Sequence, residues 1–88
     1  MFDIDKNIHK KVTIDFFTAE LEKVKKRRKE LRSEIQDLEN KKMQLDWITN
    51  MKVVDQIEFE QKQLRFCLLS AQNEIIYCQQ EIIKALQG

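Results

Sequence analysis

The residues best suited to bind a charged ligand are the basic stretch "KVKKRRK" at positions 23–29, where only Val24 interrupts the positive charges. Clustered lysine and arginine side chains can hold a phosphate backbone or an acidic protein surface by electrostatics alone. The same composition is typical of a solvated helix surface, which we favour because no aromatic side chains that could stack on bases lie among the charges. Nucleic-acid binding stays as the alternative. The candidate contacts to an anionic partner are Lys23, Lys25, Lys26, Arg27 and Lys29.

Few other residues suggest chemistry. Cys67 and Cys78 are eleven residues apart, which on one helix separates them by about 16 Å and excludes a mutual disulfide. Reduced thiols are typical of the cell interior. The single histidine, His9, has no evident nucleophile or metal-ligand partners nearby, and the chain has no glycine-rich loop for phosphates. We therefore expect a protein that is not an enzyme, with no catalytic residues, metal or cofactor.

The composition predicts an all-α chain. Its 88 residues include no proline and one glycine, the last residue, while 35% are charged and the net charge is only +1. Without turn and breaker residues a sheet protein is excluded, and long helices are favoured. The chain has no apolar run of about 18 residues and no secretory signal pattern. These features predict an intracellular, cytoplasmic protein that does not enter a membrane.

A heptad pattern runs through the first half of the chain. Apolar residues recur at alternating steps of three and four, as on the contact face of a coiled-coil helix. We expect a helix over about 13–47, with Thr13 as its N-cap. We call the ten positions of this pattern the first seam. Eight of them are apolar and two are basic: Ile14, Phe17, Leu21, Val24, Arg28, Leu31, Ile35, Leu38, Lys42 and Leu45.

The pattern stops after Leu45 and restarts in a new phase at Val54. A change of phase predicts a turn, at about 48–51 with Thr49 and Asn50 at its centre, followed by a helix over about 52–87. Folding the chain there pairs the two seams layer by layer, so we predict an antiparallel, coiled-coil-like helical hairpin. The second seam is Val54, Ile57, Gln61, Leu64, Leu68, Ala71, Ile75, Cys78, Ile82 and Ala85.

The second helix carries another apolar row, nearly opposite its seam, and the first helix shows no comparable second face. A contiguous apolar stripe usually marks an interface. We predict a homodimer in which two hairpins pair through their second helices into a four-helix bundle. The alternative is an unidentified protein partner docked on the same residues. The predicted interface residues are Phe59, Phe66, Leu69, Ile76 and Ile83.

The first twelve residues show a different pattern. Apolar residues occupy even positions, among them Phe2, Ile4, Ile8 and Val12, with lysines between. Period-two alternation predicts an extended segment, and chain termini are often poorly ordered. We expect residues 1–12 to form an extended or flexible arm, and residues 13–88 to form the hairpin.

A small charged hairpin without a pocket is suited to binding and not to catalysis. We predict a non-catalytic protein–protein interaction module, such as an adaptor, an assembly factor or an inhibitor of a larger machine. Such a module could be a small accessory protein of a phage or mobile element. The alternative is a nucleic-acid-associated protein that uses residues 23–29.

Overall fold

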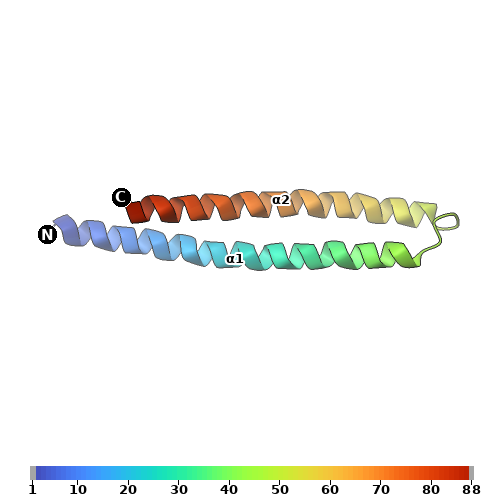
Figure 1. Ribbon diagram of the computed structural model, residues 1–88, viewed down its shortest axis with the longest axis horizontal. Coiled ribbons are helices and arrows are strands. Elements are labelled where there is room, and N and C mark those ends of the chain that lie inside the picture. The colour runs from blue at the N-terminus through green and yellow to red at the C-terminus, as the bar shows by residue number, and fades with distance from the viewer. Residues whose placement is uncertain (1, 88) are drawn as a thin grey trace.

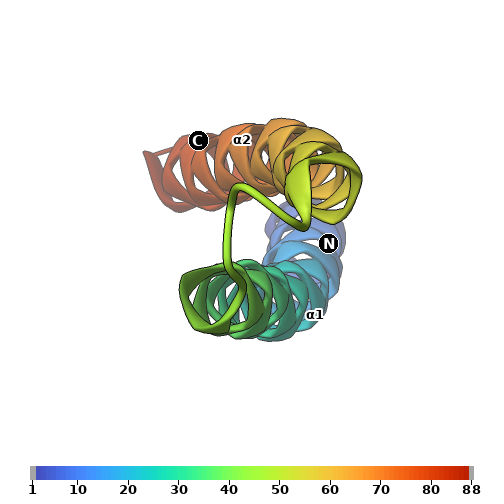
Figure 2. The same ribbon diagram turned by 90° about the vertical axis from the view of Figure 1, so that its right-hand side faces the viewer.

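The computed structural model describes the backbone from Phe2 to Gln87 and the side chains of residues 7–87. It contains two α-helices, α1 (Phe2–Gln44) and α2 (Met51–Gln87). The helices lie side by side and run in opposite directions (Figure 1), and they cross when viewed along the long axis (Figure 2). The molecule measures 73 × 14 × 13 Å. The prediction of an all-α antiparallel hairpin is confirmed.

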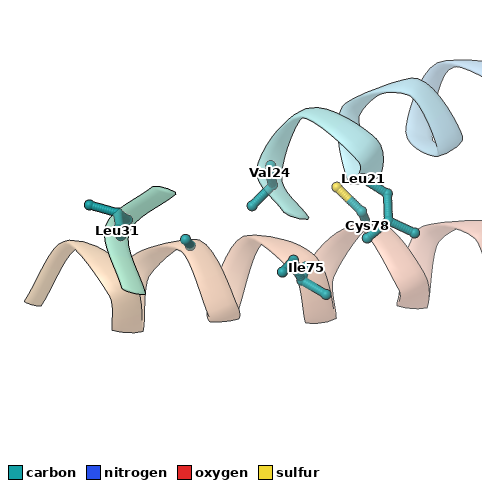
Figure 3. Close-up of a cluster of buried hydrophobic side chains, with 6 residues drawn as sticks. Leu21, Val24, Leu31, Ile75 and Cys78 are labelled. Atoms are coloured by element: carbon teal, nitrogen blue, oxygen red, sulfur yellow. The ribbon is translucent and has the colours of Figure 1, made fainter. Parts of the chain in front are cut away.

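The core is a single line of side chains between the two helices. Every residue of the first and second seams is buried or half-buried. Leu21 lies beside Cys78, and Val24 lies over Ile75, in the middle of this line (Figure 3). These pairs belong to the layers that the heptad pattern predicts. The seam residues supply most of the apolar surface that this two-helix molecule buries. Each fully buried leucine or isoleucine contributes about 1.5–3 kcal/mol to the stability of the fold.

Ion pairs contribute little to holding the helices together. Among residues 7–87, the ion pairs join residues three apart on the same helix, such as Lys23 with Glu20 and Lys84 with Glu81, both at 3.4 Å. Exposed pairs of this kind are worth about 0.2–1 kcal/mol each. Arg28, the basic residue of the first seam, is half-buried at the level of Ala71, which is 2% exposed. A small residue there leaves room for the arginine stem while its head reaches water.

The turn begins earlier than the sequence pattern predicts. Helix α1 ends at Gln44 and not near residue 47, and the predicted centre at Thr49 and Asn50 is the last part of a loop over residues 45–50. Asp46 organises this loop: its carboxylate accepts from the backbone N–H of Ile48 at 3.1 Å, and its carbonyl accepts from that of Asn50 at 2.9 Å. A short polar side chain that bonds the backbone two residues on competes with helix continuation.

Asn50 directly precedes α2, and it does not adopt the left-handed conformation that asparagine tolerates. Its carbonyl accepts the first helical hydrogen bond, from the N–H of Val54 at 2.9 Å. Its side-chain amide donates back to the carbonyl of Asp46 at 3.0 Å. Among the described residues, no non-glycine residue has a positive φ.

The extended conformation that the alternating pattern predicts for the first twelve residues is not found in residues 2–12, because α1 begins at Phe2. Thr13 is therefore not an N-cap, and its hydroxyl donates to the carbonyl of His9 at 2.9 Å inside the helix. The alternating pattern was misleading because Ile8 and Val12 are also four residues apart, which is helical spacing. Lys10 ties this end of α1 to α2 through a 3.0 Å hydrogen bond from Nζ to the carbonyl of Leu86.

Candidate interaction surface

Helix α2 carries a row of large apolar side chains on the face that points away from α1. We call this row the stripe. Each of its members is more than half exposed, from 51% for Ile76 and Ile83 to 74% for Phe66. The structure thus brings the predicted interface residues onto one face of one helix, and the hairpin alone leaves them in water. The stripe consists of Phe59, Phe66, Leu69, Ile76 and Ile83.

Polar residues complete the same three-four repeat. Lys62, Asn73 and Gln80 fall at the remaining positions of the stripe, and all three are exposed. From Phe59 to Ile83 the repeat extends over about 36 Å of helix. The stripe therefore has the length and spacing of a coiled-coil seam, with three polar interruptions that must be accommodated by whatever covers it.

The basic stretch surrounds α1 and does not form one face. Val24, inside it, is buried in the core, and Arg28 is half-buried on the seam. Of the candidate anion contacts, Lys25 is half-buried and the others are exposed. Lys23 pairs with Glu20 at 3.4 Å while its side chain stays 75% exposed. We call residues 23–29 the collar, because its charges point in several directions and only some of them can reach a single flat ligand.

A buried polar contact interrupts the apolar seams near the turn. Gln61 is 1% exposed, and its Nε2 donates to Oε2 of Glu39 at 2.8 Å and to the carbonyl of Ile35 at 3.5 Å. Lys42 donates from Nζ to Oε1 of the same glutamine at 3.5 Å and pairs with Glu39 at 3.1 Å. Because a buried amide without partners is costly, these bonds explain how a glutamine is accommodated in the core.

The seam pattern alone pairs Lys42 with Ile57 and leaves Gln61 facing Leu38, so the pattern does not predict this contact. The sequence carried one indication of this contact. Each seam has a polar residue near the turn, Lys42 in the first and Gln61 in the second, and the two lie within about one helical turn of each other along the hairpin. Glu39 lies outside the first seam and had no signal of its own. Glu39 takes part only because the long side chain of Gln61 reaches past the first seam to the side of α1 on which Glu39 lies.

The hydrogen bond from Gln61 lowers the pKa of Glu39 below its ordinary value of 4.5, and the bond and charge of Lys42 add to this effect. A lowered pKa means that this carboxylate stabilises the fold above pH 4.5 and that its contribution is lost as the pH falls through the folded-state value. We expect the thermal midpoint of the wild type to fall on acidification below this pH, and the fall to be shallower in Glu39→Gln. Circular dichroism melts at a series of pH values measure both.

The matched control is Glu34→Gln, which neutralises an exposed carboxylate of the same helix. Its melting curve should follow the acid dependence of the wild type. Equal acid dependence of wild type and Glu39→Gln would show that the contact between Glu39 and Gln61 is not coupled to stability.

The turn end of the hairpin is apolar and exposed, which the heptad pattern does not predict. Trp47, Ile48 and Met51 are 56–86% exposed. Together with Val54 of the seam they line a hollow of about 440 Å³, with Asp55 and Glu58 at its border. We call this region the tip. The loop conformation set by Asp46 produces it, because it turns Trp47 and Ile48 outward.

The first helix also has a short exposed apolar row, contrary to the sequence analysis. Ile8, Val12 and Phe16 are spaced four residues apart and are 57–61% exposed. Phe16 packs edge-on against Phe17, with ring centroids 5.2 Å apart, and Phe17 packs in the same way against Tyr77 of α2 at 5.9 Å. The row was missed because residues 1–12 were assigned to an extended arm.

The cysteines occupy different surroundings. Cys78 is buried in the core, and burial raises the pKa of its thiol above the ordinary value of 9.0, with Glu20 and Glu74 adding to the shift. Cys67 is half-buried and lines a groove of about 480 Å³ between the helices, whose border carries acidic side chains. Both thiols are free. Among the described residues, no group of three or more histidine, cysteine, aspartate or glutamate side chains could hold a metal ion.

Comparison with protein families, with curated proteins and with solved structures gives no match to this chain. Within residues 2–87, neither helix combines the length and apolar character that crossing a bilayer requires. The geometry of the hairpin is therefore the basis for assigning a function.

Proposed function

We propose that the chain is a non-catalytic protein–protein interaction module that acts as a homodimer through the stripe of α2. The observation that supports this proposal is the exposure of Phe59, Phe66, Leu69, Ile76 and Ile83 on one helix face. Single exposed apolar residues are ordinary, but a continuous row of them usually marks an interface. A two-helix chain also buries too little apolar surface to be very stable alone, so a second contact would stabilise it.

The position of the stripe supports one arrangement of the proposed pair. Because the stripe lies nearly opposite the seam, two hairpins that pair through it place their α2 helices in the centre and their α1 helices on the outside. In this version of the dimeric four-helix bundle, the four helices lie in a row and the collar remains accessible on each α1. Duplicated outer surfaces suit an adaptor, an assembly factor or an inhibitor, since two linked sites bind a repeated partner more tightly than one.

Sedimentation equilibrium across a concentration series tests the proposal. We expect a mass of twice 10.6 kDa that declines toward the single-chain value on dilution. A single-chain mass at every concentration would contradict the homodimer and leave a foreign protein as the occupant of the stripe.

The second candidate is binding to nucleic acid, favoured by one observation, the exposed lysines of the collar. The spread of the collar around α1 makes it less suited to a phosphate backbone than a flat basic face. Changing Lys25, Lys26 and Lys29 to Gln separates the two candidates. We expect the variant to keep its fold and mass, because Lys26 and Lys29 are exposed, Lys25 is only half-buried, and charges near the surface each contribute little to stability.

If the collar binds DNA or RNA, the same triple change should flatten the slope of log affinity against log salt by roughly 2–3. Gel-shift titrations at several salt concentrations measure this slope for wild type and variant. A matched control removes equal charge elsewhere, by changing the exposed residues Lys11, Lys41 and Lys52 to Gln. Tight wild-type binding to random-sequence DNA that only the collar variant loses would favour the second candidate.

A further inference from the structure

We propose that the groove beside Cys67 binds a basic amphipathic helix of a partner protein, a segment whose apolar side chains are flanked by lysine or arginine. The groove has a volume of about 480 Å³. This inference rests on the proposed role in protein binding but not on the homodimer, because the residues that line the groove include no member of the stripe. Both helices contribute to its lining: Glu34, Asp37, Leu38, Glu60, Gln63, Leu64 and Cys67.

The floor of the groove is apolar because a short side chain stands at one flank of the second seam. Cys67 lies one heptad from both Glu60 and Glu74, so it takes the position that long carboxylate side chains occupy in the neighbouring heptads. The short thiol leaves Leu38 and Leu64 incompletely covered, and both leucines are only half-buried although they belong to the seams. The groove therefore offers apolar surface that a large side chain of a partner would cover.

The border of the groove carries three exposed carboxylates, Glu34, Asp37 and Glu60. Within residues 7–87, none of them belongs to an ion pair, and no basic side chain lines the groove. Glu60 accepts a 3.5 Å hydrogen bond from Nε2 of Gln56, which is neutral, and the heptad layers place the exposed Lys41 opposite it without an ion pair. Three negative charges beside apolar surface favour an occupant with positive charge.

At the level of Cys67, the opposite flank of the hairpin is basic. The heptad layers place Arg32 opposite Arg65 there, and both side chains are exposed. Like charges repel, so a basic segment is disfavoured on that flank and favoured on the acidic one. The two flanks therefore select both the sign of the occupant's charge and the side of the hairpin on which it lies.

A helix is suited to this groove because the groove runs between two helices that lie side by side (Figure 1). Apolar residues at steps of three and four would cover the leucines of the floor, while basic residues beside them reach the carboxylates. The collar of a second copy does not offer such a segment, because its apolar residue, Val24, is buried in the core. In the exposed row that begins at Ile8, the neighbouring Lys10 already donates to the carbonyl of Leu86. Charge and shape thus favour a foreign chain.

Protection of the Cys67 thiol tests whether the groove is occupied. The probe is a synthetic helical peptide with leucine on one face and lysine elsewhere, and the matched peptide carries glutamate in place of lysine. Mass spectrometry locates and times maleimide addition, and the buried Cys78 reports whether the hairpin stays folded. With the lysine peptide at ten times its dissociation constant, alkylation of Cys67 should slow about tenfold, since about a tenth of the grooves remain free. The glutamate peptide should not slow it.

Neutralising the border provides the second test. We expect the dissociation constant of the lysine peptide to rise about tenfold when the three carboxylates are removed together, because each exposed charge contributes a modest attraction. Anisotropy of a labelled peptide measures the constant, and circular dichroism checks that the variant stays helical. The border variant is Glu34→Gln, Asp37→Asn and Glu60→Gln.

The matched control removes the same charge from exposed positions outside the groove. Its dissociation constant for the lysine peptide should stay within about twofold of the wild type, because distant surface charges are screened by salt. The control variant is Asp15→Asn, Glu22→Gln and Glu58→Gln.

The outcomes separate this inference from the homodimer. Protection of Cys67 that the border variant weakens and the control variant keeps supports the proposed site. No binding of the lysine peptide, binding without protection, or equal weakening in both variants overturns it. Protection that grows with protein concentration in the absence of peptide would make a second copy the occupant and also overturns it. None of these results changes the mass in sedimentation equilibrium, which tests the homodimer by itself.

Discussion

Replacing Phe59 and Phe66 with serine should dissociate the proposed dimer into folded single chains. The two substitutions would remove four phenylalanines from the proposed symmetric interface, and each buried phenylalanine contributes about 1.5–3 kcal/mol. We therefore expect the dissociation constant to rise about a thousandfold or more. Helicity should be largely retained, because both side chains point away from α1 and neither belongs to the core. Sedimentation equilibrium and circular dichroism on the same samples measure the two effects.

The matched control for this experiment is Phe16→Ser. Phe16 is 57% exposed, the same fraction as Phe59, but it lies on α1 outside the stripe. This variant should remain dimeric. If the double variant Phe59→Ser/Phe66→Ser is also dimeric with unchanged affinity, the stripe is not the dimer contact, and docking of a foreign protein becomes the better explanation of its exposure.

Ile75→Ala should destabilise the hairpin itself. Ile75 is 5% exposed in the central core cluster, and shortening a buried isoleucine to alanine costs about 2–5 kcal/mol through lost transfer energy and the cavity left behind. Small domains have total stabilities of about 5–15 kcal/mol, so this loss is a large fraction of the whole. We expect a lower thermal midpoint at every protein concentration, followed by circular dichroism.

The neighbouring residue provides the comparison. Ile76 has the same side chain but is 51% exposed and belongs to the stripe. Ile76→Ala should weaken dimerisation and leave the melting of the dilute single chain nearly unchanged. Equal effects of the two variants on the dilute chain would show that seam and stripe are not separate surfaces.

Most of the fold was predictable because a coiled-coil hairpin repeats one rule along its whole length. The positions of Leu21, Val24 and Ile75 in the core follow from steps of three and four residues, which place them on one side of a helix. The exposure of Phe59 and Phe66 follows from the same rule, because they fall on the opposite side. Periodicity predicts faces well since it depends only on local helix geometry.

Features without periodicity were not predictable from the pattern. The end of α1 at Gln44 depends on the hydrogen bonds of Asp46, and the exposed tip depends on the loop that these bonds create. The helical state of residues 2–12 was missed because two periods fitted the same few residues. Local hydrogen bonding decided the end of α1 and the shape of the tip. The continuation of a long helix decided the conformation of residues 2–12.

The sequence by itself determined that this chain has two amphipathic helices, where the core face of each lies, and that α2 has a second apolar face. These properties need only the spacing of residue types along a helix. The tertiary structure alone decided that Gln61 is buried among Ile35, Glu39 and Lys42, and which side chains form the tip. The reason is physical: hydrogen bonds between distant residues depend on the relative level and rotation of two packed helices, and neither quantity is encoded in the period of one helix alone.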